Sequence, residues 1–171
     1  FDEVFGGLYP GQIILVAGNP GTGKTTLAAK ILYEGARRWG EPGVYISNME
    51  TRDDFYTYMR SLGMDFESLE EKGLFRFVEM LIPTSRDALM EFSRRLTKTT
   101  LEMKAKRICI DSITPLLALG HPIEARAILR NALKTVVKTL NAIVILVAEL
   151  PYGAESVGHG VEEFMVDGVI R

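Results

Sequence analysis

Cysteine is nearly absent from this sequence, and no hydrophobic run is long enough to cross a membrane. Cys109 is the one cysteine among 171 residues, so no disulfide can form within the chain. A lone cysteine inside an apolar run indicates a reducing compartment, and we expect the cytoplasm. The longest apolar stretch, residues 142–148, is far shorter than the roughly 20 residues that a membrane-spanning helix needs. No charged segment followed by an apolar one opens the chain, so we expect neither secretion nor membrane insertion.

The sequence also lacks a strong net charge and any segment with the composition of an interdomain linker. Lys and Arg number 20 against 22 Asp and Glu, which gives a formal net charge of -2 and no overall basic field to attract nucleic acid. No Pro/Gly/Ser-rich tract, low-complexity segment or internal repeat interrupts the chain, so we expect residues 1–171 to form one domain. The chain opens at Phe1 and stops at Arg171 within an apolar run. We therefore expect the domain to be incomplete at both ends.

Two hydrophobic patterns alternate along the chain, and together they predict an α/β fold. Short β-branched runs predict strands at residues 12–17, 43–47, 74–79, 107–111, 142–149 and 164–170. Apolar residues at helical spacing predict helices at residues 25–39, 53–62, 86–103 and 122–141. Residues 13–17 and 143–147 have no polar alternation, which is typical of central parallel strands covered by helices on both faces.

The helix predicted at residues 122–141 has a basic stripe opposite its apolar face. Arg126, Arg130, Lys134 and Lys138 follow one another at four-residue steps. A solvated helix face explains such a stripe more simply than a nucleic-acid surface does.

A glycine-rich loop joins the first predicted strand to the first predicted helix. It reads Gly18-Asn19-Pro20-Gly21-Thr22-Gly23-Lys24-Thr25-Thr26 and fits the pattern G-x-x-x-x-G-K-[ST]. The glycines let the backbone wrap tightly with its N–H groups turned inward, so these nine residues are expected to hold a polyphosphate. Lys24 would supply a charge at the β- and γ-phosphates, and the Thr25 hydroxyl would bind Mg²⁺.

A carboxylate ends the strand predicted at residues 107–111. Asp111 would reach the carboxyl edge of the sheet, where α/β folds bind ligands, and would complete the Mg²⁺ site with Thr25. No N-K-x-D motif is present, which disfavours a regulatory GTPase. Kinases of small metabolites and nucleosides use the same loop and stay as competitors at this point.

Several segments together resemble the KaiC and RadA branch of the RecA-like ATPases. These segments are FDEVFGGL at residues 1–8, PGQ at 10–12, the glycine-rich loop, EPGVYIS at 41–47, Asp111-Ser112, and GVEEFMVD at 160–167. The resemblance implies a RecA-like P-loop core with a mostly parallel twisted sheet, helices on both faces and carboxyl-terminal strands beyond the end of this chain. It also implies ATP with Mg²⁺ as the ligand and a ring or filament of identical subunits. In that family the nucleotide lies between neighbours, and Arg or Lys residues from an adjacent subunit reach the γ-phosphate. In KaiC-type domains these residues come from those later strands.

The resemblance also identifies the position of the residue that activates water, and here the chain departs from the pattern. The family has acidic residues at the end of the second strand, where this chain has Met49-Glu50-Thr51. Met49 stands at the first of these acidic positions, and its thioether can neither accept the proton nor orient the water. Catalysis must therefore depend on Glu50, together with Lys24, or be slow. Glu50 would face away from the site on a regular strand, and a helix-entry acid is an equally good interpretation of it. Glu149, at a position that often senses the γ-phosphate, also reads as a structural carboxylate.

Three functions stay open from the sequence. The first is an ATPase that couples Mg²⁺-ATP binding and slow hydrolysis to self-assembly or partner remodelling, and the second is a nucleotide-gated binding module with little turnover. The third is a RadA-like recombinase paralogue that acts on DNA. Its DNA-binding loops would be residues 114–124 and 150–160, and neither contains Lys or Arg, so the composition does not support a DNA partner. His121 and His159 are isolated from other metal-ligand types and are expected at the surface.

Overall fold

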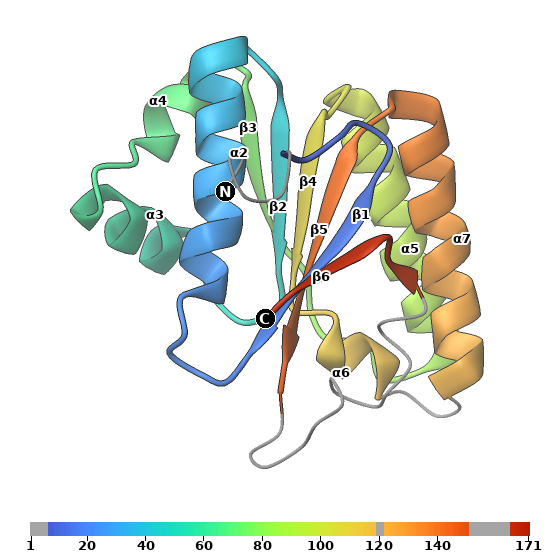
Figure 1. Ribbon diagram of the computed structural model, residues 1–171. Helices are drawn as coiled ribbons and strands as arrows, with labels where there is room; N and C mark the ends of the chain where they lie inside the picture. Colours follow the sequence, from blue (N-terminus) through green and yellow to red (C-terminus); the bar gives the residue numbers. More distant parts are fainter. Residues whose placement is uncertain (1–6, 119–121, 151–164) are drawn as a thin grey trace.

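The computed structural model describes residues 7–118, 122–150 and 165–171, and they form a layered α/β fold (Figure 1). Its six-stranded sheet has the order β3-β2-β4-β5-β1-β6, and every strand pairs with its neighbours in parallel. The strands are β1 (Ile13–Gly18), β2 (Gly43–Ser47), β3 (Phe75–Glu79), β4 (Arg107–Asp111), β5 (Ile143–Glu149) and β6 (Gly168–Ile170). The predicted fold class is confirmed, since even the two fully apolar strands, β1 and β5, lie inside the sheet.

Helices cover both faces of the sheet (Figure 1). One face carries α2 (Lys24–Trp39), α3 (Arg52–Ser61) and α4 (Phe66–Glu71), and the other carries α5 (Arg86–Glu102) and α7 (Pro122–Leu140). The short helix α6 (Thr114–Leu117) follows β4. No helix in the described ranges is both long and apolar enough to cross a bilayer.

The predicted boundaries differ from the observed ones in three places. Helices α4 and α6 were not predicted, because one or two turns are too short to show a helical period. Residues 114–124, which the sequence predicts to be a loop, therefore contain α6 and the start of α7. The strand predicted at 164–170 is too long, since β6 begins only at Gly168. Just before it, the Asp167 carboxylate accepts a hydrogen bond from the backbone N–H of Ile13 (2.8 Å).

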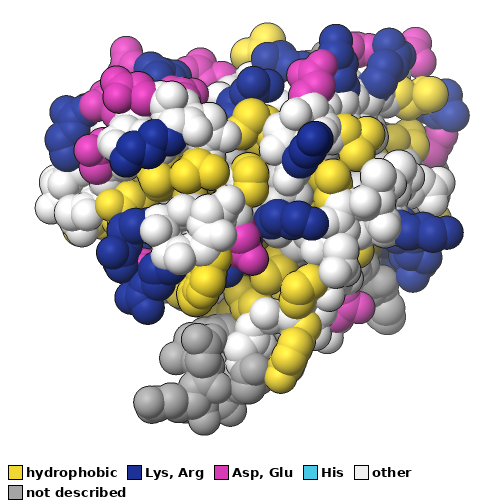
Figure 2. All heavy atoms as spheres, turned by 90° about the horizontal axis from the view of Figure 1, so that it is seen from above, with side chains coloured by type: hydrophobic (Ala, Val, Ile, Leu, Met, Phe, Trp, Pro, Cys, Tyr) yellow, Lys and Arg dark blue, Asp and Glu magenta, His cyan; other side chains and the backbone are white. Residues whose placement is uncertain are grey.

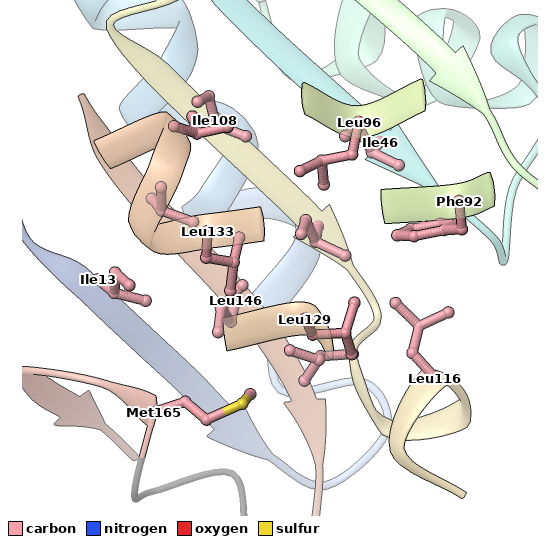
Figure 3. Close-up of a cluster of buried hydrophobic side chains, with 14 of the residues drawn as sticks. Ile13, Ile46, Phe92, Leu96, Ile108, Leu116, Leu129, Leu133, Leu146 and Met165 are labelled. Carbon is pink, nitrogen blue, oxygen red and sulfur yellow. The ribbon is translucent and has the colours of Figure 1, made fainter. Parts of the chain in front are cut away.

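The alternation of side chains along each strand divides the core into two clusters. Ile13, Ile46, Ile108 and Leu146 face α5 and α7, where they pack on side chains such as Leu133 (Figure 3). Their neighbours Val16, Tyr45, Cys109 and Val147 face α2 and α3. Because alternate residues share a face, Asp111 lies on the same face as Cys109, toward α2. This parity brings the carboxylate to the start of α2, where the glycine-rich loop ends.

Gly35 of α2 lies against Arg107, the first residue of β4. A Cβ built on Gly35 would be 2.2 Å from the Arg107 Nε. Arg107 is held by the Glu41 carboxylate (2.7 Å) and the Ile31 carbonyl (2.8 Å), and it stacks on the Trp39 ring at 5.0 Å. The guanidinium therefore cannot move aside without losing these contacts.

We expect Gly35→Ala to lower the free energy of unfolding, although alanine is the better helix former. Overpacking costs about 1–3 kcal/mol, whereas the gain in helix propensity is about 1 kcal/mol. In an Arg107→Ala background the clash is gone, so the same change should stabilise the protein. Urea denaturation of the wild type, the two single variants and the double variant measures both signs. A stabilising Gly35→Ala in the wild-type background would contradict the argument.

Candidate phosphate- and metal-binding site

The glycine-rich loop runs from the end of β1 to the start of α2 and is closed by its own hydrogen bonds. The Thr22 hydroxyl donates to the Asn19 carbonyl (2.9 Å), and the Thr22 backbone N–H lies 3.4 Å from the same oxygen. A Cβ on Gly18 would be 2.7 Å from the Thr22 Oγ1, so the tight turn requires glycine there. Gly23 has φ +84°, a left-handed conformation that other residues rarely adopt.

The first turn of α2 has no side-chain cap. Gly23 occupies the N-cap position without offering an oxygen, and the first turn contains no acidic residue. The uncapped N–H groups and the positive end of the helix dipole therefore remain available to an anion. In many helices an N-cap side chain accepts hydrogen bonds from these N–H groups, as the Thr51 side chain does in α3. The loop is thus built like a phosphate-binding loop in its backbone as well as in its sequence.

Lys24 lies over this loop beside a cavity. Its Nζ donates to the Asn19 carbonyl (2.8 Å), which holds the ammonium across the loop. The cavity has a volume of about 340 Å³, and its lining includes Gly18, Thr22, Lys24 and Leu150. Because the loop and Lys24 line the same cavity, the ammonium is placed to contact the outer phosphates of a nucleotide bound there.

Thr25 and Asp111 meet at the carboxyl edge of the sheet. The Thr25 hydroxyl donates to the Asp111 Oδ2 (2.7 Å), and the Tyr45 hydroxyl donates to the same oxygen (2.7 Å). Asp111 is only 7% exposed. Hydroxyl and carboxylate oxygens are the donors that Mg²⁺ prefers, so this pair fits the ion. Within the described residues, no group of three or more His, Cys, Asp and Glu side chains could hold a metal.

Burial keeps the groups beneath Asp111 in their neutral forms. The pKa of the Tyr45 phenol is raised well above its usual value, first by burial and further by the negative charge of Asp111. Burial likewise raises the pKa of the Cys109 thiol well above its usual value. Tyr45 therefore stays protonated over the physiological range and remains a hydrogen-bond donor to the carboxylate.

The chain bends sharply where β2 ends. The Ser47 hydroxyl accepts hydrogen bonds from the backbone N–H groups of Met49 (3.1 Å) and Glu50 (2.9 Å). Met49 is 57% exposed. The pKa of the Glu50 carboxyl is raised by desolvation from its neighbours and by the negative charges of Asp111 and Asp54. The bend therefore brings Glu50 within electrostatic reach of Asp111, although a regular strand would have turned it away.

Asn48 links the ends of β2 and β4, and sequence reasoning missed it. Its backbone N–H donates to the Asp111 carbonyl (3.0 Å), and its amide side chain both donates to the Ser112 carbonyl (2.8 Å) and accepts from the Ser112 N–H (3.0 Å). The Tyr45 contact to Asp111 was missed as well. A tyrosine in an otherwise apolar strand was the one signal for it, because its hydroxyl needs a partner when buried.

Glu149 ends β5 beside the loop. It lies opposite Gly18 in the parallel register, and its backbone N–H donates to the Thr114 hydroxyl (3.1 Å). Its place beside the loop suits either expected role, a sensor or a structural carboxylate. His121, His159 and most of the segment at residues 150–160 lie outside the described residues, as does most of the resemblance at residues 160–167.

Comparisons with known proteins match nearly the whole chain to one family and one fold. The family model described as "ATPase: KaiC" matches residues 1–171. A UPF0273 protein of Pyrococcus horikoshii is 32% identical over 184 residues, which cover 99% of this chain and 73% of the relative. The circadian clock oscillator protein KaiC of Synechococcus elongatus is 31% identical, over 99% of this chain and 34% of that protein. The crystal structure of a KaiC-like protein from Pyrococcus horikoshii superposes with a TM-score of 0.82 at 34% identity, covering 99% of this chain and 74% of that one.

Proposed function

The chain belongs to the KaiC family of ATPases, and from this premise we propose that it binds Mg²⁺-ATP at residues 18–26 and hydrolyses it slowly. The family and the RecA-type P-loop fold make an ATP-binding ATPase the general expectation. The observation that carries the proposal for this chain is the Thr25–Asp111 hydrogen bond, set directly beside an uncapped, glycine-rich helix start. We treat residues 1–171 as one RecA-like unit, and a cytoplasmic location remains part of the proposal.

Each residue of the site has a defined task in this proposal. The loop N–H groups and the Lys24 ammonium hold the phosphates and offset their negative charge. Thr25 and Asp111 hold the metal ion through their oxygens. When bound, Mg²⁺ neutralises charge on the β- and γ-phosphate oxygens. The residues that we propose to contact the phosphates are Gly18, Asn19, Pro20, Gly21, Thr22, Gly23, Lys24, Thr25 and Thr26.

Glu50 is the residue that we assign to the attacking water. Its raised pKa makes it a stronger base than an ordinary glutamate, and the bend at Ser47 supports its position near Asp111. Met49 cannot assist, so turnover rests on one carboxylate held by a turn rather than by a strand. We therefore expect slow hydrolysis.

We further propose that ATP binding is coupled to self-assembly or to remodelling of a partner. The phosphate loop follows β1 and Glu50 follows β2, so both lie at the carboxyl edge of the sheet, the side from which a neighbouring subunit would approach the γ-phosphate. We do not assign any Arg or Lys of this chain as the residue that reaches the γ-phosphate of a neighbouring subunit. A homo-oligomer with the nucleotide near the subunit interface is thus the proposed active form.

The experiment that tests this function measures size and phosphate release together. Light scattering of the full-length protein with and without Mg²⁺-ATP should show growth of the particle, while a parallel assay follows inorganic phosphate. Growth with slow phosphate release supports the proposal. Growth with no release at all favours the second candidate, a nucleotide-gated binding module, which the exposed Met49 supports. If the protein neither binds nucleotide nor forms larger particles with it, both candidate functions are refuted.

We do not propose DNA as the partner. Lys and Arg side chains are spread over the end of the molecule seen in Figure 2, but Asp and Glu side chains lie among them. On α7, Arg130, Lys134 and Lys138 line a cavity of about 370 Å³ together with Asp167. This mixture of charges is the composition expected of a solvated surface.

A further inference from the structure

We propose that Tyr45 is a positioning residue whose hydroxyl fixes Asp111 in the orientation that binds Mg²⁺. This inference rests on the proposed function, because it concerns the same metal site. It adds a residue from β2 to a site that the loop and β4 alone would otherwise define. Sequence patterns of phosphate-binding loops contain no signal for this residue.

The carboxylate of Asp111 is held asymmetrically. Its Oδ2 accepts from two hydroxyls, those of Thr25 and Tyr45, each at 2.7 Å. Its Oδ1 accepts no hydrogen bond from any residue in the described part of the chain. Two donors on one oxygen set the rotation of the carboxylate, so the other oxygen remains available to a metal ion or its water.

Tyr45 is suited to hold this orientation because its side chain is buried and packed against other rings. It is 1% exposed, and its ring packs against Phe55 at 4.6 Å and Phe77 at 5.7 Å between centroids. The parallel register places it beside Cys109, two residues before Asp111 on the neighbouring strand. Thr25, by contrast, is only partly buried at the start of α2. The rigid donor is therefore the tyrosine, and the threonine is the donor that also faces the ligand.

Two effects of the Tyr45 hydroxyl oppose each other. A hydrogen bond draws charge from the carboxylate and slightly weakens its attraction for a cation. The same bond orients the ligand and prevents rotation, and partners of this kind are worth about 10–100-fold in metal affinity. The positional effect is the larger, so removal of the hydroxyl should weaken Mg²⁺ binding.

Tyr45→Phe tests the inference with minimal change to the packing. Fluorescence of an ATP analogue, titrated with Mg²⁺ in the full chain, gives the Mg²⁺ concentration at half-maximal binding. We expect that midpoint to rise about 10–100-fold, while the affinity for the nucleotide without Mg²⁺ stays the same. Tyr56→Phe is the matched control, because it removes a hydroxyl that donates to another carboxylate, Glu70 (2.9 Å). Its Mg²⁺ midpoint should equal that of the wild type.

A double variant separates positioning from a general loss of structure. In an Asp111→Asn background, Tyr45→Phe should shift the midpoint no further, since the oriented carboxylate is already gone. A further shift there, or a midpoint within twofold of wild type for Tyr45→Phe alone, would overturn the inference. Failure of the wild-type protein to bind the analogue would instead refute the proposed function, so the two failures are distinguishable.

Discussion

Replacing Lys24 with alanine should weaken ATP binding by roughly 10–100-fold while leaving the fold intact. A hydrogen bond to a charged group contributes about 1.5–3 kcal/mol, and the alanine would remove a side-chain cation that is held across the loop. The folded state loses little, because the Lys24 Nζ contacts the Asn19 carbonyl at an exposed position. Titration with a fluorescent ATP analogue in the presence of Mg²⁺ measures the loss.

Lys30→Ala is the matched control for this change. Lys30 lies on the same helix, is 54% exposed and pairs with Glu34 at 2.9 Å, away from the loop. Loss of such a surface pair costs at most about 1 kcal/mol of stability, and it should leave ATP binding unchanged. An affinity for ATP that is equal in Lys24→Ala, Lys30→Ala and wild type would show that the loop does not bind phosphate in the proposed way.

The sequence predicts those features of the site that depend on consecutive residues or on the alternation of side chains along a strand. The glycine-rich loop reads directly from consecutive residues, and strand alternation places Asp111 on the face of Cys109 and hence toward α2. The hydrogen bond between Thr25 and Asp111 could be expected from these two facts. In each case a short stretch of sequence already contains the geometry.

The sequence does not predict contacts that depend on how strands distant in the chain pair with each other. The Tyr45 and Asn48 contacts need the register of β2 against β4, which places Tyr45 opposite Cys109 and Ser47 opposite Asp111. No periodicity within either strand specifies that register. The bend at the end of β2 was equally hidden, because it arises from one side chain, the Ser47 hydroxyl, which accepts two backbone N–H groups.

Glu50→Gln should reduce ATP turnover by about 10²–10⁴-fold, the usual contribution of general-base assistance. Glutamine keeps the size and most contacts of the side chain but cannot take a proton from water. The cap of α3 is unaffected, because Thr51 rather than Glu50 provides it through the Asp54 N–H. The raised pKa of Glu50 also favours this role. Phosphate release under saturating Mg²⁺-ATP gives the rate, and binding of the ATP analogue should be unchanged.

Met49→Glu is the complementary variant, since it tests whether the missing acid limits the rate. Met49 is 57% exposed, so a glutamate fits there without disturbing the core. If Glu50 alone activates the water, the new carboxylate should add little, and if the thioether position is the productive one, the rate should rise. Brisk hydrolysis that survives Glu50→Gln would place the base elsewhere. Glu149 would then be the next residue to replace, because β5 brings it level with Gly18 at the start of the loop.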